Sequence, residues 1–270
     1  MGVGKRRDAI KVSNMANYTE DKRVLSVPVI DEHSLTKARD AIRDGSVWGI
    51  AVSGKLASGK DTVAQRVMEE LSNKPSVQLS WATPLKDELD SILDTLSLST
   101  GPDEAALSIC ETGVPLQHAR VLAERLWDEA RSGARARGRT PLMRWALQYL
   151  GTDVRRHMDP EYWVSRAAAL AVDNLNAGHS VFYTDCRFPN EVDAAQHIGL
   201  FTIRLNVSPE VQAARLESRD GLQVDASALT HPSEIALDDY DHFDLVVDNN
   251  GPIEKVVDEI VSAVRNRILL

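Results

Sequence analysis

The sequence predicts an α/β protein built on an open, mostly parallel sheet of five strands. Five short apolar runs alternate with stretches of helical periodicity, and such alternation is typical of parallel strands covered by helices on both faces. The predicted strands are Val47–Ser53, Val77–Trp81, Ser180–Asp185, Leu200–Val207 and Asp244–Asp248. With 270 residues, 43% of them hydrophobic, the chain is long enough to bury a large core.

Helices are expected between these strands and in one long insertion. The first, Ser34–Arg43, has Ser34 as its predicted N-cap and ends at Asp44-Gly45. The others show apolar residues three and four apart; they are Asp61–Leu71, a helix after Ala82–Asp87, Val114–Ala130, Met143–Leu150 behind Pro141, Tyr162–Leu175, a helix from Ser208-Pro209 onwards, and Ile253–Ile268. The stretch Gly151–Pro160 is expected to interrupt the helices beside it.

The chain divides into an arm and one domain. Residues 1–31 are polar, charged and without periodicity, so we expect a poorly ordered arm. Residues 32–270 form the α/β domain, and residues 95–165 within it are a helical insertion that could cover a site. The basic stretch Arg131–Arg139 in this insertion is either a flap over an anionic substrate or a solvated loop, and the loop is favoured.

Composition narrows the classes of partner. A formal net charge of −9 disfavours a broad face for duplex nucleic acid, which needs clustered Lys and Arg. Cys110 and Cys186 lack metal-ligand or disulfide spacing, as is usual in a reducing cytoplasm. Neither a membrane-spanning run nor a secretory signal is recognisable. We therefore expect a cytoplasmic protein, in the host cytoplasm if viral, that binds small anionic molecules.

One glycine-rich segment lies between a predicted strand and a predicted helix. Gly54-Lys-Leu-Ala-Ser-Gly-Lys60 matches the pattern G-x-x-x-x-G-K. Its glycines let backbone N–H groups turn toward phosphate oxygens, the helix adds its positive N-terminal end, and Lys60 can reach the β- and γ-phosphates. The predicted nucleotide-binding residues are Gly54, Lys55, Ala57, Ser58, Gly59, Lys60, Asp61 and Thr62.

The residue after the lysine departs from the usual pattern. This position is normally Ser or Thr, whose hydroxyl binds Mg²⁺, but here it is Asp61, followed by Thr62. Two interpretations stay open. Asp61 binds the metal directly or through water, or it contacts the acceptor while Thr62 binds phosphate.

The segment Ser53–Thr62 resembles the loop of bacteriophage deoxynucleoside monophosphate kinases and the related phosphomevalonate kinases, which also place Asp after the lysine. Further segments occur in the order that this family shows: Ala82–Lys86, Leu147–Asp153 with Tyr162-Trp163, Thr184–Arg187 with Glu191, and Thr230–Glu234. The resemblance covers Gly49 to Ile268. It implies an adenylate-kinase-like P-loop kinase fold, ATP with Mg²⁺ as donor, a nucleoside monophosphate as acceptor, and a homodimer.

Two charged residues follow a predicted central strand. Asp185 ends this strand, where it could bind the hydration shell of a metal ion shared with Asp61, and Arg187 lies two residues on. A guanidinium there could bridge the donor and acceptor phosphates during transfer. The alternative is an Asp–Arg pair on a solvated rim. Similarity to the kinase family favours the catalytic interpretation.

Two arginines of the helix after Ser208-Pro209 resemble the lid arginines of small-molecule kinases. Arg215 and Arg219 are four apart, and closure over the phosphates would exclude water. The alternative is an exposed helix face with acidic neighbours. Residues 208–235 are thus lid-like. His231, Ser233 and Glu234 in this segment match the family, but their chemistry assigns them no role.

The helical insertion carries the predicted acceptor site. Arg144 and Gln148 are four apart and share a helix face, so they could bind a phosphate and a base edge, while Trp163 offers a stacking face. Residue chemistry alone favours a surface pair and a core tryptophan. The resemblance assigns nine residues to the acceptor: Lys86, Arg144, Gln148, Gly151, Thr152, Asp153, Arg155, Trp163 and Glu191.

The leading hypothesis is transfer of the ATP γ-phosphate to a deoxynucleoside monophosphate, giving deoxynucleoside diphosphates for DNA synthesis. One alternative keeps the fold and changes the acceptor to a hydroxymethylated base in DNA, phosphomevalonate or dephospho-coenzyme A. Another is a regulatory module that binds ATP without transferring phosphate. Arg187, Arg144 and Gln148 speak against the regulatory module, because a switch needs no acceptor pocket.

Overall fold

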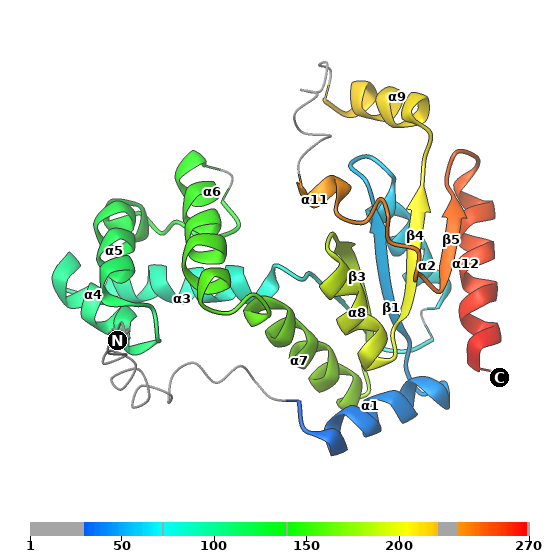
Figure 1. The fold of residues 1–270 in the computed structure, drawn as a ribbon, viewed down its shortest axis with the longest axis horizontal. Coiled ribbons are helices and arrows are strands. Elements are labelled where there is room, and N and C mark those ends of the chain that lie inside the picture. Colours follow the sequence, from blue (N-terminus) through cyan, green and yellow to red (C-terminus); the bar gives the residue numbers. More distant parts are fainter. Residues whose placement is uncertain (1–29, 72, 139, 221–231, 269–270) are drawn as a thin grey trace, which may run out of the picture.

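The computed structural model describes residues 30–71, 73–138, 140–220 and 232–268. Its centre is a sheet of five parallel strands in the order β2-β3-β1-β4-β5 (Figure 1). The strands are β1 (Gly49–Gly54), β2 (Ser76–Leu79), β3 (Ser180–Cys186), β4 (Phe201–Asn206) and β5 (Leu245–Asp248). The predicted α/β class and the five parallel strands are confirmed. The predicted arm, residues 1–31, falls almost entirely outside the described residues.

Helices cover both faces of the sheet. Three pack on one face: α1 (Glu32–Arg43), α7 (Tyr162–Asn176) and α8 (Pro189–Ile198). Two pack on the other: α2 (Lys60–Glu70) and α12 (Ile253–Ile268). Successive strand residues alternate between these faces, as Ile50 and Ala51 do, and both are buried. Burial on both sides explains the continuous apolar run of this central strand.

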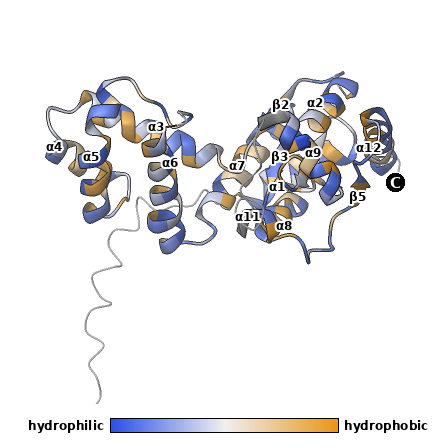
Figure 2. Ribbon diagram, turned by 90° about the horizontal axis from the view of Figure 1, so that it is seen from above, coloured by the Kyte–Doolittle hydropathy of each residue, from blue (hydrophilic) through white to orange (hydrophobic). Residues whose placement is uncertain are grey.

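A group of helices extends from one side of the sheet and has its own core (Figure 1). It consists of α3 (Thr83–Leu98), α4 (Pro102–Glu111), α5 (Leu116–Arg131), α6 (Pro141–Gln148) and the π-helix η1 (Tyr149–Arg156). Seen from above, this helical group is a separate body connected to the sheet through α7 (Figure 2). Tyr162 and Trp163 of α7 pack into the helical group, whereas Val164 and Ala168 pack under the sheet. One helix therefore belongs to both cores.

Two further helices lie near the carboxyl ends of the strands. They are α9 (Pro209–Asp220), after β4, and α11 (Pro232–Ile235), ahead of β5 (Figure 1). Parallel strands end at the same edge of the sheet, and β1 lies between β3 and β4. The helices that follow β1 and β3, namely α2 and α8, pack on opposite faces of the sheet, so the chain reverses its direction between these two neighbouring strands. Ligands of such sheets bind in the crevice that this reversal creates.

The structure corrects three sequence predictions about helices. The N-cap of α1 is Asp31, whose carboxylate accepts the N–H of Ser34 at 2.9 Å, so Ser34 lies inside the helix. The helix α4 begins at Pro102, in a segment for which no separate helix was predicted. The stretch from Gly151 does not break the chain of helices, because η1 continues α6. A Cβ on Gly151 would lie 2.9 Å from Leu85 Cδ2, so glycine permits close packing on α3.

Arg155 of η1 is a structural residue, in contrast to its predicted contact with the acceptor. Its side chain is 1% exposed and pairs with Glu88 of α3, with Nη2 and Oε1 2.7 Å apart. The guanidinium also donates to the carbonyl oxygens of Gly113 and Thr112, at 2.9 and 3.0 Å. Its nitrogens are occupied by these bonds, which join η1 to α3 and to the turn before α5.

Replacing Arg155 is predicted to destabilise the protein strongly. Arg155→Ala leaves the half-buried Glu88 without its cationic partner and the carbonyl oxygens of Gly113 and Thr112 without their donor, a loss that typically costs about 3–5 kcal/mol. The free energy of unfolding, measured by urea denaturation, should fall by that amount. Arg120→Ala removes an exposed arginine of α5 and should change stability by less than about 0.5 kcal/mol. Equal stability of the two variants would contradict the structural role of Arg155.

Candidate functional site

The glycine-rich loop, residues 54–60, connects the central strand β1 to α2 at the carboxyl edge of the sheet. Its glycines are required by space and backbone conformation. A Cβ on Gly54 would lie 2.3 Å from Ser58 Oγ, and Gly59 has a φ of +83° as the N-cap of α2. Lys60 follows as the first residue of α2 and is only 7% exposed. The loop therefore places a buried ammonium group beside a helix N-terminus.

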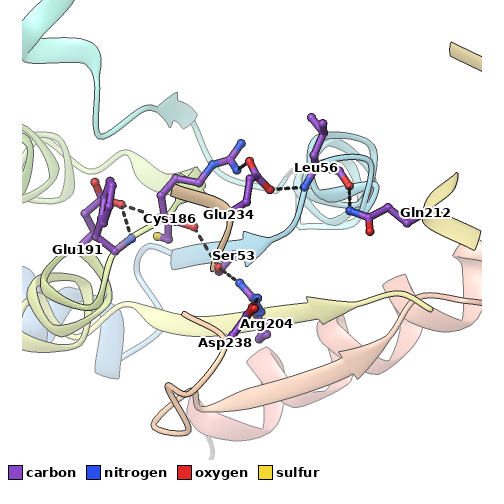
Figure 3. Close-up of polar contacts among 10 residues, drawn as sticks. Ser53, Leu56, Cys186, Glu191, Arg204, Gln212, Glu234 and Asp238 are labelled. Carbon is purple, nitrogen blue, oxygen red and sulfur yellow. Dashed lines mark hydrogen bonds and ion pairs between the residues drawn. The ribbon is translucent and has the colours of Figure 1, made fainter. Parts of the chain in front are cut away.

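Carbonyl groups of the loop are held from its outer side. Gln212 of α9 donates to the carbonyl oxygen of Leu56 at 2.7 Å, and Asn249 donates to that of Ser58 at 2.7 Å. Arg215 Nη1 also donates to the oxygen of Ser58, at 3.2 Å. Figure 3 shows Gln212 and Glu234 on either side of Leu56. Residues from α9 and from the end of β5 thus fix the orientation of two peptide groups.

The opposite sides of these peptide groups face a candidate anion site. In a trans peptide the N–H points away from the preceding C=O, and the described residues contain no cis peptide bond. The N–H groups of Ala57 and Gly59 therefore point away from Gln212 and Asn249. Neither finds an acceptor in the described part of the chain. Two such donors next to a helix N-terminus form a suitable site for a phosphate group.

Charged side chains gather around Lys60. Burial lowers the pKa of its ammonium group, and the positive charge of Arg187 lowers it further, while Asp61, Glu234 and Asp185 act in the opposite direction. The guanidinium of Arg187 forms an ion pair with Glu234. The structure thus brings together four residues predicted as catalytic, Lys60, Asp61, Asp185 and Arg187.

Two acidic residues shape the turns on which this cluster depends. Asp185 accepts the N–H of Trp81 at 3.0 Å and the hydroxyl of Ser80 at 2.5 Å, so it fixes the start of α3. Glu191 accepts the N–H of Arg187 at 2.7 Å and is 4% exposed. Glu191 was predicted to contact the substrate. Its burial and its backbone partner instead give it the task of holding the turn after β3.

The structure describes the side chain of one of the two predicted lid arginines. Arg215 lies beside the glycine-rich loop, but it donates to the carbonyl oxygens of Ser58 and Asn249, the latter at 2.8 Å. In this conformation it supports the loop from outside instead of covering the anion site. The side chain of Arg219, and those of His231 and Ser233, lie outside the part of the molecule that the structure describes.

The predicted acceptor residues divide into exposed and buried ones. Arg144, Gln148, Thr152 and Asp153 are exposed, Lys86 is half-buried, and no side chain of the five forms a hydrogen bond within the described residues. Trp163 is 3% exposed and donates from Nε1 to the carbonyl oxygen of Gly151 at 2.9 Å. In this conformation Trp163 belongs to the core and does not offer a stacking face.

Several residues of the site carried no usable sequence signal. Gln212 and Asn249 are ordinary polar residues that meet the loop only through the fold. Asp238 forms an ion pair with Lys55, with Nζ and Oδ2 2.7 Å apart. A cleft of about 600 Å³ lies between α2 and β2, and its lining includes Asp61 and Gln78. The position of Asn249 directly after a strand is the feature that could have indicated a place in the site, because strand ends surround such sites.

A parallel sheet of this order, with a glycine-rich loop and a buried lysine between its central strand and the next helix, defines a P-loop kinase fold. No model of a protein family matches the chain. It is 30% identical over 236 residues to a protein of Acanthamoeba polyphaga mimivirus described as "Putative deoxynucleotide monophosphate kinase", and the match covers 80% of this chain and 96% of that protein. The chain therefore belongs to the deoxynucleotide monophosphate kinase family and is a nucleotide kinase, a class of phosphotransferase.

The relative comes from a mimivirus, and a bacteriophage origin stays a prediction. Among the described residues, no helix combines the length and apolar character needed to cross a membrane.

Glu191 is predicted to make stability depend on pH. Burial is the main cause that raises its pKa from 4.5 to about 7. Between these pH values the folded chain keeps a proton that the unfolded chain has lost, so stability falls as the pH rises through this window, by on the order of 3 kcal/mol. Glu191→Gln, whose amide resembles the neutral carboxyl group, should abolish this fall.

Urea denaturation of both proteins from about pH 4.5 to about pH 7.5 measures this effect. The stability of the variant relative to the original protein should increase with pH. Glu259→Gln, a change at an exposed glutamate of α12, should keep the original pH dependence. A Glu191→Gln variant with an unchanged pH dependence would show that this carboxyl group titrates normally.

Proposed function

We propose that this kinase transfers the γ-phosphate of ATP to a deoxynucleoside monophosphate, giving the diphosphate used for DNA synthesis. The observation that carries the proposal is the glycine-rich loop. Its N–H groups at Ala57 and Gly59 find no acceptor among the described residues, and they lie next to the buried Lys60 and to Arg187. Membership of the deoxynucleotide monophosphate kinase family supports the choice of acceptor.

The loop and its neighbours have the chemistry for the donor phosphates. N–H groups of the loop and the N-terminus of α2 bind phosphate oxygens, and Lys60 compensates their charge. Burial disfavours the charged form of the Lys60 ammonium group in the free protein. The negative charge of a bound phosphate would favour this charged form. Arg187 extends the positive charge toward the carboxyl end of β3, where donor and acceptor would meet.

The residues beside the loop fit Mg²⁺, which prefers oxygen ligands and keeps several of its waters. Asp61 is an exposed carboxylate in the first turn of α2, and Thr62 adds a hydroxyl group. Each carboxylate oxygen of Asp185 accepts one hydrogen bond and has further acceptor capacity for a metal-bound water. Bound there with the phosphates, Mg²⁺ would neutralise charge that develops during transfer.

The acceptor is proposed to lie between the loop and the helical group. Arg144 and Gln148 are exposed on α6. Lys86 lies in the first turn of α3, whose start Asp185 fixes through Ser80 and Trp81. The arginine offers a planar set of donors to the acceptor phosphate, and the glutamine offers paired groups to a base edge. Phosphate transfer then needs the two anions held in line and water kept out.

The first test measures ADP release from ATP and Mg²⁺ with a panel of deoxy- and ribonucleoside monophosphates. Duplex DNA with hydroxymethylated bases, phosphomevalonate and dephospho-coenzyme A belong in the same panel. We expect turnover with at least one deoxynucleoside monophosphate, and a loss of at least about 100-fold in Lys60→Ala. Lys255→Ala removes an exposed lysine of α12 and should keep full activity.

The outcomes of this panel separate the candidate functions. Turnover only with another acceptor would replace the proposed substrate and keep the kinase mechanism. ATP binding without turnover of any acceptor would contradict phosphate transfer and favour a regulatory module.

A second prediction concerns the acceptor site. Arg144→Ala should raise KM for the monophosphate by about 10- to 100-fold, because a charge-assisted contact to phosphate is lost. KM for ATP should stay within about twofold, since the loop is untouched. Arg120→Ala, at a similarly exposed arginine of the helical group, should change neither constant. Equal behaviour of the two variants would move the acceptor site away from α6.

A further inference from the structure

Glu234 is a buried carboxylate to which the sequence assigned no role. Its side chain is 8% exposed, and its two oxygens have different partners. Oε2 accepts the N–H of Leu56 in the glycine-rich loop at 2.6 Å, while Oε1 forms the ion pair with Nη1 of Arg187. Figure 3 shows the carboxylate of Glu234 directed at the loop from α11. One carboxylate thus connects α11, the loop and the turn after β3.

The backbone of Arg187 has its own anchor, but its guanidinium depends on Glu234. Glu191 holds the N–H of Arg187 at 2.7 Å and thereby fixes the backbone. The guanidinium lies at the end of a flexible side chain, which adopts many rotamers unless a partner selects one. Within the described residues, Glu234 is the carboxylate that pairs with this guanidinium.

The contact with Glu234 leaves donors of Arg187 available to a substrate. Guanidinium carries five N–H donors, and in the described part of the chain Nε and Nη2 of Arg187 form no hydrogen bond. The side chain is also 25% exposed. Glu234 therefore restricts the guanidinium without using it up, and its negative charge offsets the repulsion between Arg187 and Lys60.

We propose that Glu234 is a positioning residue for Arg187, holding the guanidinium against the glycine-rich loop so that its free N–H groups meet the transferred phosphate. This inference rests on the phosphate transfer proposed above. A guanidinium fixed in advance stabilises the charge that develops during transfer without reorganising at that moment. Glu234 should accordingly affect the rate of transfer more than the binding of ATP.

A double-mutant cycle tests this role. Glu234→Gln keeps an oxygen for the N–H of Leu56 and removes the charge that holds Arg187. We expect kcat to fall by about 10- to 100-fold, with KM for ATP within about threefold. In an Arg187→Ala background, Glu234→Gln should change kcat by less than about twofold, because the group that it positions is gone.

A second carboxylate of the same segment provides the matched control. Asp238 also contacts the loop, through Lys55, but forms no hydrogen bond or ion pair with Arg187. The effect of Asp238→Asn on kcat should depend much less on the presence of Arg187 than the effect of Glu234→Gln does, because Asp238 makes no direct contact with Arg187. If Glu234→Gln does not fold, Glu234→Asp keeps the charge but is too short for both contacts, and it should show the same dependence on Arg187.

The results distinguish two failures. If the original protein is active and Glu234→Gln lowers kcat equally with and without Arg187, the positioning role is overturned and the kinase proposal stays intact. An original protein that transfers phosphate to none of the acceptors would overturn both. A loss of kcat that disappears in the Arg187→Ala background is the result expected from positioning.

Discussion

The orientation of two peptide groups in the glycine-rich loop is the constraint on which the site depends. A phosphate can be bound there only if N–H groups, and not carbonyl oxygens, face it. Gln212, Arg215 and Asn249 enforce this by donating to the carbonyl oxygens of Leu56 and Ser58 from behind. The loop is therefore preorganised by parts of the chain that follow it by more than 150 residues.

Charge balance is the second constraint. Lys60, Arg187 and Arg204 lie near one another at the carboxyl edge of the sheet. Burial lowers the pKa of Arg204, and the negative charges of Asp238 and Glu234 act in the opposite direction. Arg204 donates to Ser53 Oγ at 2.8 Å beneath the loop, and Ser53 donates to the carbonyl oxygen of Cys186 at 3.0 Å (Figure 3). Cations that would repel one another are thus separated by carboxylates and hydroxyl groups, each with a specific partner.

The sequence was informative wherever local chemistry decides the structure. The five strands lie within two residues of their predicted positions, because continuous apolar runs identify strands buried on both faces. The motif of the loop identified Gly59 and Lys60 for a similar reason. The positive φ of Gly59 and the start of α2 at Lys60 are both set by the local sequence. Asp185 and Arg187 were chosen because they follow a strand end and because the chain resembles the kinase family, since the strand-end rule alone left a solvated ion pair open.

The errors arose where distant contacts decide. Arg155 and Trp163 have the residue types of a phosphate clamp and a stacking face, but Glu88 and the carbonyl oxygen of Gly151 bind them inside the helical group. The breaker signal of Gly151 was overridden because its missing Cβ permits packing against Leu85. Gln212 and Asn249 could not be found from the sequence, because the fold alone brings them to the loop.

The helix α7 has a consequence for how the molecule comes apart. Since consecutive residues of one helix, Trp163 and Val164, are buried in different cores, the helical group cannot unfold without stripping buried surface from the sheet side. The two bodies are thermodynamically linked even though they look separate. Cutting the chain at their apparent boundary would leave half of an apolar helix bare, so the helical group is not a detachable module.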